Sequence, residues 1–90
     1  MAFQHKYRGR HIGTSDQETL QSLLRAIRKE AGLSQIELAT RLNKPQSFVS
    51  KYESGERRLT ILEILEICRA INLPFASFAE RLEQALSSRA

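Results

Sequence analysis

Residues 34–55 of the chain read SQIELATRLNKPQSFVSKYESG, and this stretch decides the fold. Ser34 followed by Glu37 is a capping box, in which a hydroxyl and a carboxylate satisfy the free backbone N–H groups at the start of a helix. The next apolar residues fall on one helical face: Leu38, Ala39 and Leu42. Asn43 tolerates the left-handed conformation in which helices commonly end. The stretch therefore opens with a short helix that ends at about residue 42.

A second short helix follows after three or four residues. Pro45 cannot continue the first helix, but its backbone angle suits the first turn of the next one. From Gln46 to about residue 53 one face is apolar, and Gly55 ends the helix; the residues on that face are Val49 and Tyr52. Two helices of about two turns each bury too little surface to be stable alone, so the rest of the chain must supply a platform.

The sequence on either side predicts three more helices. The first begins at the capping box Ser15-Asp16-Gln17-Glu18, ends at Gly32 and carries the apolar residues Leu20, Leu23, Leu24, Ile27 and Ala31. Another begins at the capping box of Thr60 and Glu63, ends at Asn72 and carries Ile64, Leu65, Ile67, Cys68 and Ile71. Pro74 opens the last, about residues 74–87, whose apolar stripe is Phe75, Phe78, Leu82 and Leu86. We expect a compact, all-α, five-helix domain over residues 15–90, preceded by a flexible basic arm over residues 1–14.

Length and composition exclude several classes of protein. A chain of 90 residues, 41% hydrophobic and 27% charged, is ordinary for one small globular domain. It has no room for a deep catalytic cleft together with a cofactor domain. No apolar stretch approaches the roughly 20 residues that span a bilayer, so we expect no membrane partner. The single cysteine, Cys68, excludes an internal disulfide and suits a reducing cytoplasm, and its place on an apolar face predicts a small buried side chain.

The positive charge is unevenly distributed along the chain. Residues 1–15 hold three bases and no acid, which gives +3 of the net charge of +4. Residues 33–59 hold five bases (Arg41, Lys44, Lys51, Arg57 and Arg58) against three acids (Glu37, Glu53 and Glu56), which gives +2. Residues 60–90 hold three bases against four acids. A basic middle beside a slightly acidic end predicts one side of the molecule that faces a polyanion.

The sequence contains no pattern typical of a catalytic or metal-binding site. The chain contains no cysteine–histidine pairing, glycine-rich phosphate loop or carboxylate cluster. His5 and His11 lie in the arm without a third ligand nearby. We therefore expect no enzyme, no cofactor and no metal site.

Residues 20–73 resemble the helix-turn-helix domain of the Cro/C1 (XRE) family of phage and bacterial repressors. The resemblance rests on residues 28–39, on residues 45–58 and on a spaced apolar set: Ile64, Ile67, Cys68, Ile71 and Leu73. It implies a lambda-repressor-like fold with the helix-turn-helix at about residues 34–53. It also implies a sequence-specific, cytoplasmic transcription regulator that binds double-stranded DNA and acts by occlusion or recruitment at an operator.

The resemblance assigns the helix at about residues 46–53 to the major groove. With Val49 and Tyr52 inward, the residues expected to contact bases are Gln46, Ser47, Ser50 and Lys51. A glutamine can pair with adenine, and a lysine can reach the acceptors of guanine. The residues expected to contact the DNA backbone are Gln35, Lys44, Arg57 and Arg58. For each of them the alternative is a solvated surface side chain.

Three further roles follow from this resemblance and from the helical spacing. Arg28 and Glu53 occupy positions that in the family often form a buried structural ion pair. Phe48, four residues before Tyr52, is expected to be a half-buried packing residue, with contact to a thymine methyl group as the alternative. The arm is either a basic extension that enters a minor groove or a disordered polar tail.

The sequence leaves two alternatives for the role of the last helix and two for the partner of the protein. Regulators of this class commonly bind as dimers, so we expect a homodimer. The last helix either completes the core of one chain or supplies dimer contacts through Phe75, Phe78, Leu82 and Leu86. A different function, that of an antitoxin with a toxin partner, is the alternative to a stand-alone regulator.

Overall fold

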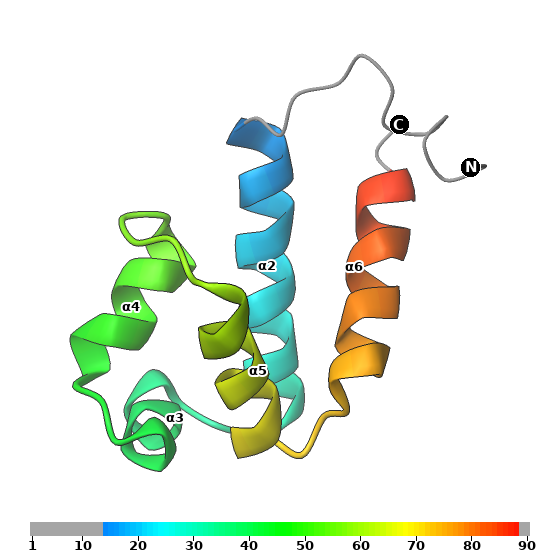
Figure 1. The fold of residues 1–90 in the computed structure, drawn as a ribbon. Helices are drawn as coiled ribbons and strands as arrows, with labels where there is room; N and C mark the ends of the chain where they lie inside the picture. The colour runs from blue at the N-terminus through cyan, green and yellow to red at the C-terminus, as the bar shows by residue number, and fades with distance from the viewer. Residues whose placement is uncertain (1–13, 89–90) are drawn as a thin grey trace.

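The structure is a computed structural model that describes residues 14–88 and contains five α-helices and no strand in that range (Figure 1). The helices are α2 (Thr14–Glu30), α3 (Gln35–Leu42), α4 (Gln46–Ser54), α5 (Ile61–Ala70) and α6 (Phe75–Ser88). The expected all-α architecture is confirmed. The expected arm lies outside the described residues, except that its last residue, Thr14, is the first residue of α2.

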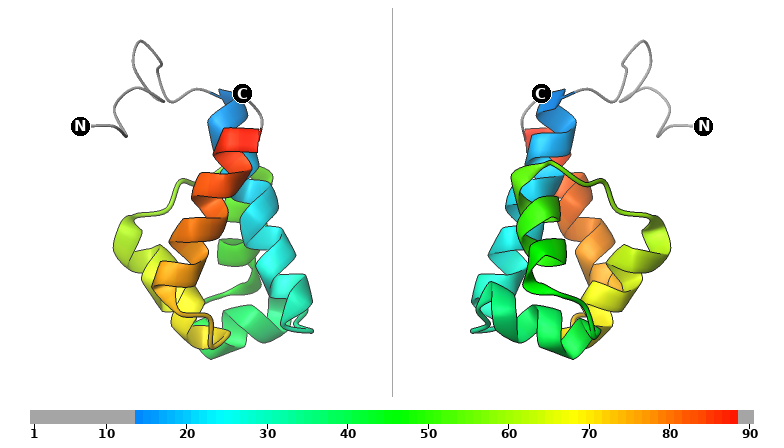
Figure 2. Two further views of the ribbon diagram at one scale, coloured as in Figure 1. Left: turned by 90° about the vertical axis from the view of Figure 1, so that its right-hand side faces the viewer. Right: turned by 90° about the vertical axis from the view of Figure 1, so that its left-hand side faces the viewer.

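The two long helices, α2 and α6, run antiparallel beside each other (Figure 1). Helix α4 packs against α2, and α3 packs against α4 and α5. Helices α3 and α4 occupy the left-hand side of Figure 1 and face the viewer in the right-hand view of Figure 2. Helix α5 packs against α3 and α6. This arrangement puts α3 and α4 on one side of the molecule and α6 on the other. None of the helices within residues 14–88 is long and apolar enough to cross a membrane.

The helix ends follow local rules, with one exception. Both later capping boxes form: Ser34 with Glu37 and Thr60 with Glu63, each closed by two hydrogen bonds of 2.8–3.1 Å. The box predicted at Ser15 is wrong in position, because α2 already begins at Thr14 and places Ser15 inside the first turn. There the Ser15 carbonyl accepts a hydrogen bond from the Thr19 hydroxyl at 3.0 Å. The terminal turn of a helix has few hydrogen bonds to hold its start, so a shift of one or two residues is common.

Four residues adopt the left-handed conformation at the turns where the sequence predicts helix ends: Gly32, Asn43, Gly55 and Asn72. Asn43 ends α3 with a φ of 57°, and its N–H donates to carbonyl oxygens of the last turn. Pro45 precedes α4 without any side-chain cap. The turn between α3 and α4 is therefore built from one left-handed asparagine and one extended proline.

The core is assembled from every helix. Its fully buried side chains are Tyr52, Phe78, Leu24, Ile27, Leu38, Ile67, Val49 and Cys68. Cys68 is buried, as predicted. Phe78 is only 2% exposed, and Phe75 and Leu82 pack against the same core. Helix α6 thus contributes Phe78 to the core of its own chain, while Phe75, Leu82 and Leu86 are partly buried, and a dimer role for the stripe stays a prediction.

Candidate nucleic-acid interface

Helix α4 presents a polar outer face over a buried anchor. Val49 and Tyr52 are 0% and 1% exposed and pack into the core. The residues expected to contact bases lie on the outside: Gln46, Ser47 and Lys51 are exposed, and Ser50 is half-buried. The buried residues of this nine-residue helix, Val49, Tyr52 and Glu53, hold it at a fixed angle to the domain.

A buried carboxylate links α4 to α2. Arg28 donates from Nε to Glu53 Oε2 at 2.7 Å and from Nη2 to Oε1 at 3.0 Å, so the ion pair expected from the family resemblance is present. A third donor, Nη1 of Arg28, reaches the Leu33 carbonyl at 2.8 Å. Burial acts to raise the pKa of Glu53, but hydrogen bonds from Arg28 and Gln35 outweigh it and hold that pKa below its usual range. Glu53 therefore stays ionised and ties α2 and the start of α3 to α4, while Arg28 also holds the loop before α3.

Gln35, in the first turn of α3, extends this network to the exposed start of α4. Its Nε2 donates to Glu53 Oε1 at 3.0 Å, and its Oε1 accepts from Gln46 Nε2 at 3.2 Å. The side chain expected to contact a phosphate is thus occupied by two protein partners. In the first turn of α3 the Glu37 N–H donates to the Ser34 hydroxyl, and the N–H groups of Gln35 and Ile36 remain available to an anion. No local pattern in the sequence predicts these linked hydrogen bonds, because Gln35 and Glu53 are 18 residues apart.

Phe48 lies on the side of α4 among aromatic and cationic neighbours. It meets Tyr52 edge to face, with ring centroids 5.5 Å apart, as expected for a half-buried packing residue. Lys44 Nζ lies 5.5 Å from the centroid of the Phe48 ring, and the Arg57 guanidinium lies 4.8 Å from it. These two cations come from the segments before and after α4. The sequence did not predict this cluster.

Arg57 is also held by an acid. Its Nη2 and Nη1 donate to the two carboxylate oxygens of Glu63 at 2.9 and 3.1 Å. Hydrogen bonds from Arg57 and from the Thr60 backbone lower the pKa of Glu63 to about 2. Half of the positive charge that the sequence assigned to the pair Arg57-Arg58 is therefore neutralised within the protein.

The free positive charge around α4 comes from three other side chains. Lys44, Lys51 and Arg58 are exposed and form no ion pair with another residue of the part of the chain described by the structure. All three lie in α4 or in the segments next to it. A polyanion approaching this side meets uncompensated cations, which is what DNA recognition requires.

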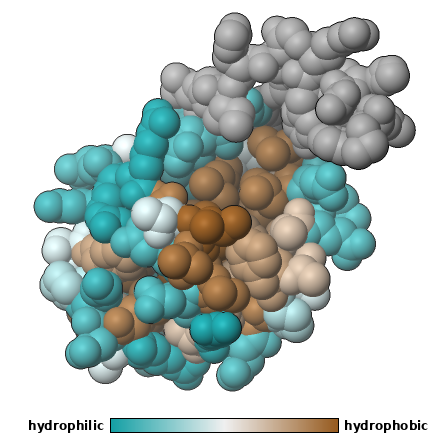
Figure 3. Space-filling model, in the orientation of Figure 1, coloured by the Kyte–Doolittle hydropathy of each residue, from teal (hydrophilic) through white to brown (hydrophobic). Residues whose placement is uncertain are grey.

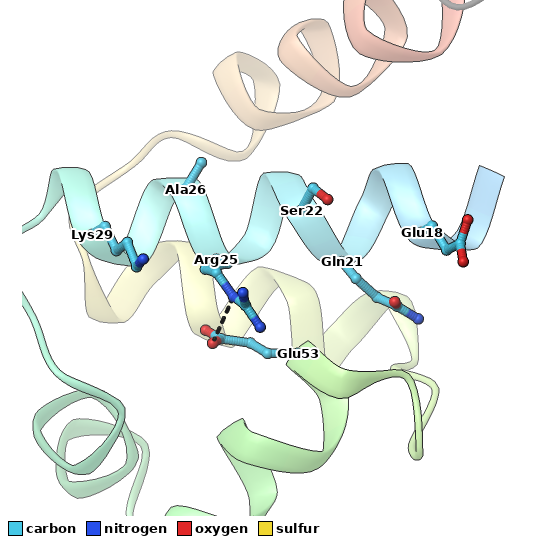
Figure 4. Close-up of a pocket in the computed structure, with 7 residues that line it drawn as sticks. All are labelled: Glu18, Gln21, Ser22, Arg25, Ala26, Lys29 and Glu53. Carbon is cyan, nitrogen blue, oxygen red and sulfur yellow. Dashed lines mark ion pairs between the residues drawn. The ribbon is translucent and has the colours of Figure 1, made fainter. Parts of the chain in front are cut away.

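A shallow polar hollow lies beside the buried ion pair, along the side of α2 that faces α4 (Figure 4). Arg25 reaches from α2 across it and makes a longer ion pair with Glu53, 3.6 Å from Nε to Oε1. The hollow holds charges of both signs, with Glu18 and Lys29 near its two ends (Figure 4). Among residues 14–88 no group of three metal-ligating side chains comes together.

Comparisons with known proteins agree with this geometry. A model of the helix-turn-helix family matches residues 24–78, a range that contains α3, α4 and α5 in full. A solved structure described as an XRE-family like protein from Pseudomonas syringae pv. tomato str. DC3000 is 43% identical, with a TM-score of 0.72 over 78% of this chain and 85% of that chain. A point mutant of the restriction-modification controller protein C.Esp1396I is 25% identical, with a TM-score of 0.76 over 81% of this chain and 97% of that chain. A search of curated proteins found no match.

Proposed function

The chain belongs to the Cro/C1-type (XRE) helix-turn-helix family of DNA-binding transcription regulators, and we propose that it binds operator DNA as a homodimer with α4 in the major groove. The observation that carries the proposal is the polar outer face of α4, held at a fixed angle by buried anchors and surrounded by free cations. The similarity to a restriction-modification controller protein supports a role in transcription control. The regulatory effect that we expect is occlusion or recruitment at the operator.

Base contacts are assigned to the exposed end and side of α4. Gln46, already held by Gln35, is oriented to pair with an adenine. Lys51 reaches the acceptors of a guanine, and Ser47 and Ser50 make permissive contacts. Contacts to the DNA backbone are assigned to the N–H group of Gln35 in the first turn of α3 and to the side chains of Lys44, Arg57 and Arg58. Lys51 contacts a phosphate wherever it does not contact a base.

Dimerisation is assigned to the face of the molecule that carries α5. Ile61 and Leu62, in the first turn of α5, are 66% and 68% exposed. Figure 3 shows hydrophobic surface at the centre of the face seen in Figure 1. A second copy that covers these side chains removes apolar surface from water. To read two half-sites, the same contact has to place a second α4 about 34 Å away, one turn of DNA.

The experiment that tests the DNA proposal is selection of bound sites from random double-stranded DNA. We expect a pseudo-palindromic motif, and Gln46→Ala and Lys51→Ala are each expected to relax it at particular positions. Arg69→Ala, an exposed cation on α5, is the control that loses the same charge and should retain the motif. A motif unchanged by both α4 variants would remove α4 as the element that reads the bases.

The dimer is tested by sedimentation of the free protein. We expect a mass near twice 10.3 kDa, and Leu62→Glu should return the protein to the mass of one chain. Ile36→Glu, which changes an equally exposed residue on α3, should leave the dimer intact. A wild-type monomer that persists at high protein concentration would contradict the homodimer. It would leave the α5 face free for a different partner, as in the antitoxin alternative.

A further inference from the structure

The Phe48 ring lies close to two cations, one from the segment before α4 and one from the segment after it. Lys44 is in the turn before α4, and Arg57 is in the loop after it. Their charged groups lie 5.5 and 4.8 Å from the ring centroid, within the range in which a ring attracts a cation. The ring itself is held by its edge-to-face contact with the buried Tyr52. Phe48 is thus the fixed group of this cluster, and the two cations are the adjustable ones.

The ordering of these cations matters for binding. Long cationic side chains lose rotamer entropy when they bind, and a contact that orders them before binding reduces that loss. Arg57 is held on a second side by the Glu63 carboxylate. A guanidinium has five N–H donors, and Glu63 and the Arg58 carbonyl engage three of those of Arg57. The other N–H groups remain for a phosphate oxygen.

We propose that Phe48 is a positioning residue for the DNA backbone: its ring holds Lys44 and Arg57 at the side of α4, where both meet phosphates. This inference rests on the proposed function, because it concerns how the same surface grips DNA. It assigns no base contact to Phe48. The role of the ring can be distinguished from simple packing, because an aliphatic side chain at position 48 also fills space but does not attract cations.

The test compares three substitutions at position 48. Phe48→Leu and Phe48→Met keep an apolar side chain but remove the ring, and Phe48→Tyr keeps the ring. Affinity for a selected operator is measured over a range of salt concentrations. Loss of ring contacts to two cations is expected to weaken binding roughly three- to tenfold. The slope of log affinity against log salt should become shallower by up to about 1.

Phe48→Tyr should restore both the affinity and the slope of the wild type. A merely structural role would change the unfolding temperature without changing the salt slope, so thermal unfolding of each variant is measured in parallel. In a protein that already carries Lys44→Ala and Arg57→Ala, Phe48→Leu should have no further effect on the slope.

Two results overturn the inference and leave the proposed function standing. The first is a salt slope unchanged by both aliphatic variants while Lys44→Ala and Arg57→Ala reduce it. The second is an equal loss of affinity on Phe48→Leu with and without the two cations, because the ring would then contact DNA directly. Failure of the proposed function looks different: the wild-type protein selects no motif and shows no steep salt dependence.

Discussion

Glu53 accepts two hydrogen bonds from Arg28, at 2.7 and 3.0 Å, across 25 residues of sequence. The Glu53 side chain is fully buried, and only 9% of the Arg28 side chain is exposed. One oxygen of Glu53 also accepts from Gln35, which in turn accepts from Gln46. A buried ion pair that fixes the fold is thereby connected through one amide to the first residue of α4.

Removal of the acid should be costly. Glu53→Ala leaves the Arg28 charge buried without its partner, and we expect a loss of about 3–5 kcal/mol in the free energy of unfolding, measured in urea. Glu30→Ala is the control, because it breaks the ion pair of Glu30 with Arg81 at the surface, where the effect should be small. Equal losses in the two variants would show that the buried pair has no special role.

The Gln35 side chain should affect base recognition indirectly, through its hydrogen bond with Gln46. Gln35→Ala removes the acceptor that orients Gln46, so we expect about a fivefold loss of operator affinity, the worth of one hydrogen bond. The selected motif should relax at the base pair assigned to Gln46. Gln84→Ala, an exposed amide on α6, is the control. An unchanged motif would mean that Gln46 is oriented without Gln35.

Glu63 should make stability depend on pH in the acid range. Its pKa is about 2 in the folded protein and 4.5 without its partners, so its contribution is fully present above pH 4.5 and is lost as the pH falls toward 2. Glu63→Gln keeps a capping oxygen but removes the charge. The unfolding temperature of this variant should therefore fall less than that of the wild type between about pH 4.5 and 2.

The control for this experiment is Glu66→Gln, an exposed acid of the same helix without an ion pair among residues 14–88. Its profile should follow that of the wild type. If Glu63→Gln and the wild type lose stability in parallel, the pair of Arg57 and Glu63 contributes nothing to folding.

The turn after α4 should require glycine. Gly55 has a φ of 91°, and an added Cβ atom would lie 2.7 Å from Gln21 Nε2. Gly55→Ala should lower the free energy of unfolding by roughly 1–2 kcal/mol because of the backbone conformation. Gly32→Ala, at a φ of 76° with no atom within 4 Å of the added carbon, isolates that conformational cost. An increase in stability in both variants, as alanine causes at negative φ, would contradict the structure.

Much of the fold was predictable because its signals are local. The capping boxes at Ser34 and Thr60 and the left-handed residues Asn43 and Asn72 act within one turn of backbone, so sequence neighbours are enough to identify them. The first capping box was misplaced for the same local reason, since a helix that begins two residues earlier keeps the same apolar face. The outward face of α4 followed from the positions of its two inward residues.

The contacts that relate these helices could not be predicted from spacing. Residues far apart in sequence meet only when helices pack, as Gln35 and Glu53 do, or when a loop folds back, as it does between Arg57 and Glu63. The same holds for the cations around Phe48, which come from both sides of α4. The sequence also left open whether Phe78 serves a dimer or the core, and packing of α6 on α2 and α5 buries it.

The sequence by itself determined five helices, the places where most of them begin and end, and a family of DNA-binding regulators, because capping, periodicity and motif spacing are properties of neighbouring residues. Only the tertiary structure decided which polar groups around α3 and α4 are not bound to other groups of the protein. It occupies the amide of Gln35 and pairs Arg57 with Glu63, while Lys44, Lys51 and Arg58 keep their charges uncompensated within residues 14–88. The physical reason is that charge compensation depends on distance in space, which the packing of the helices sets.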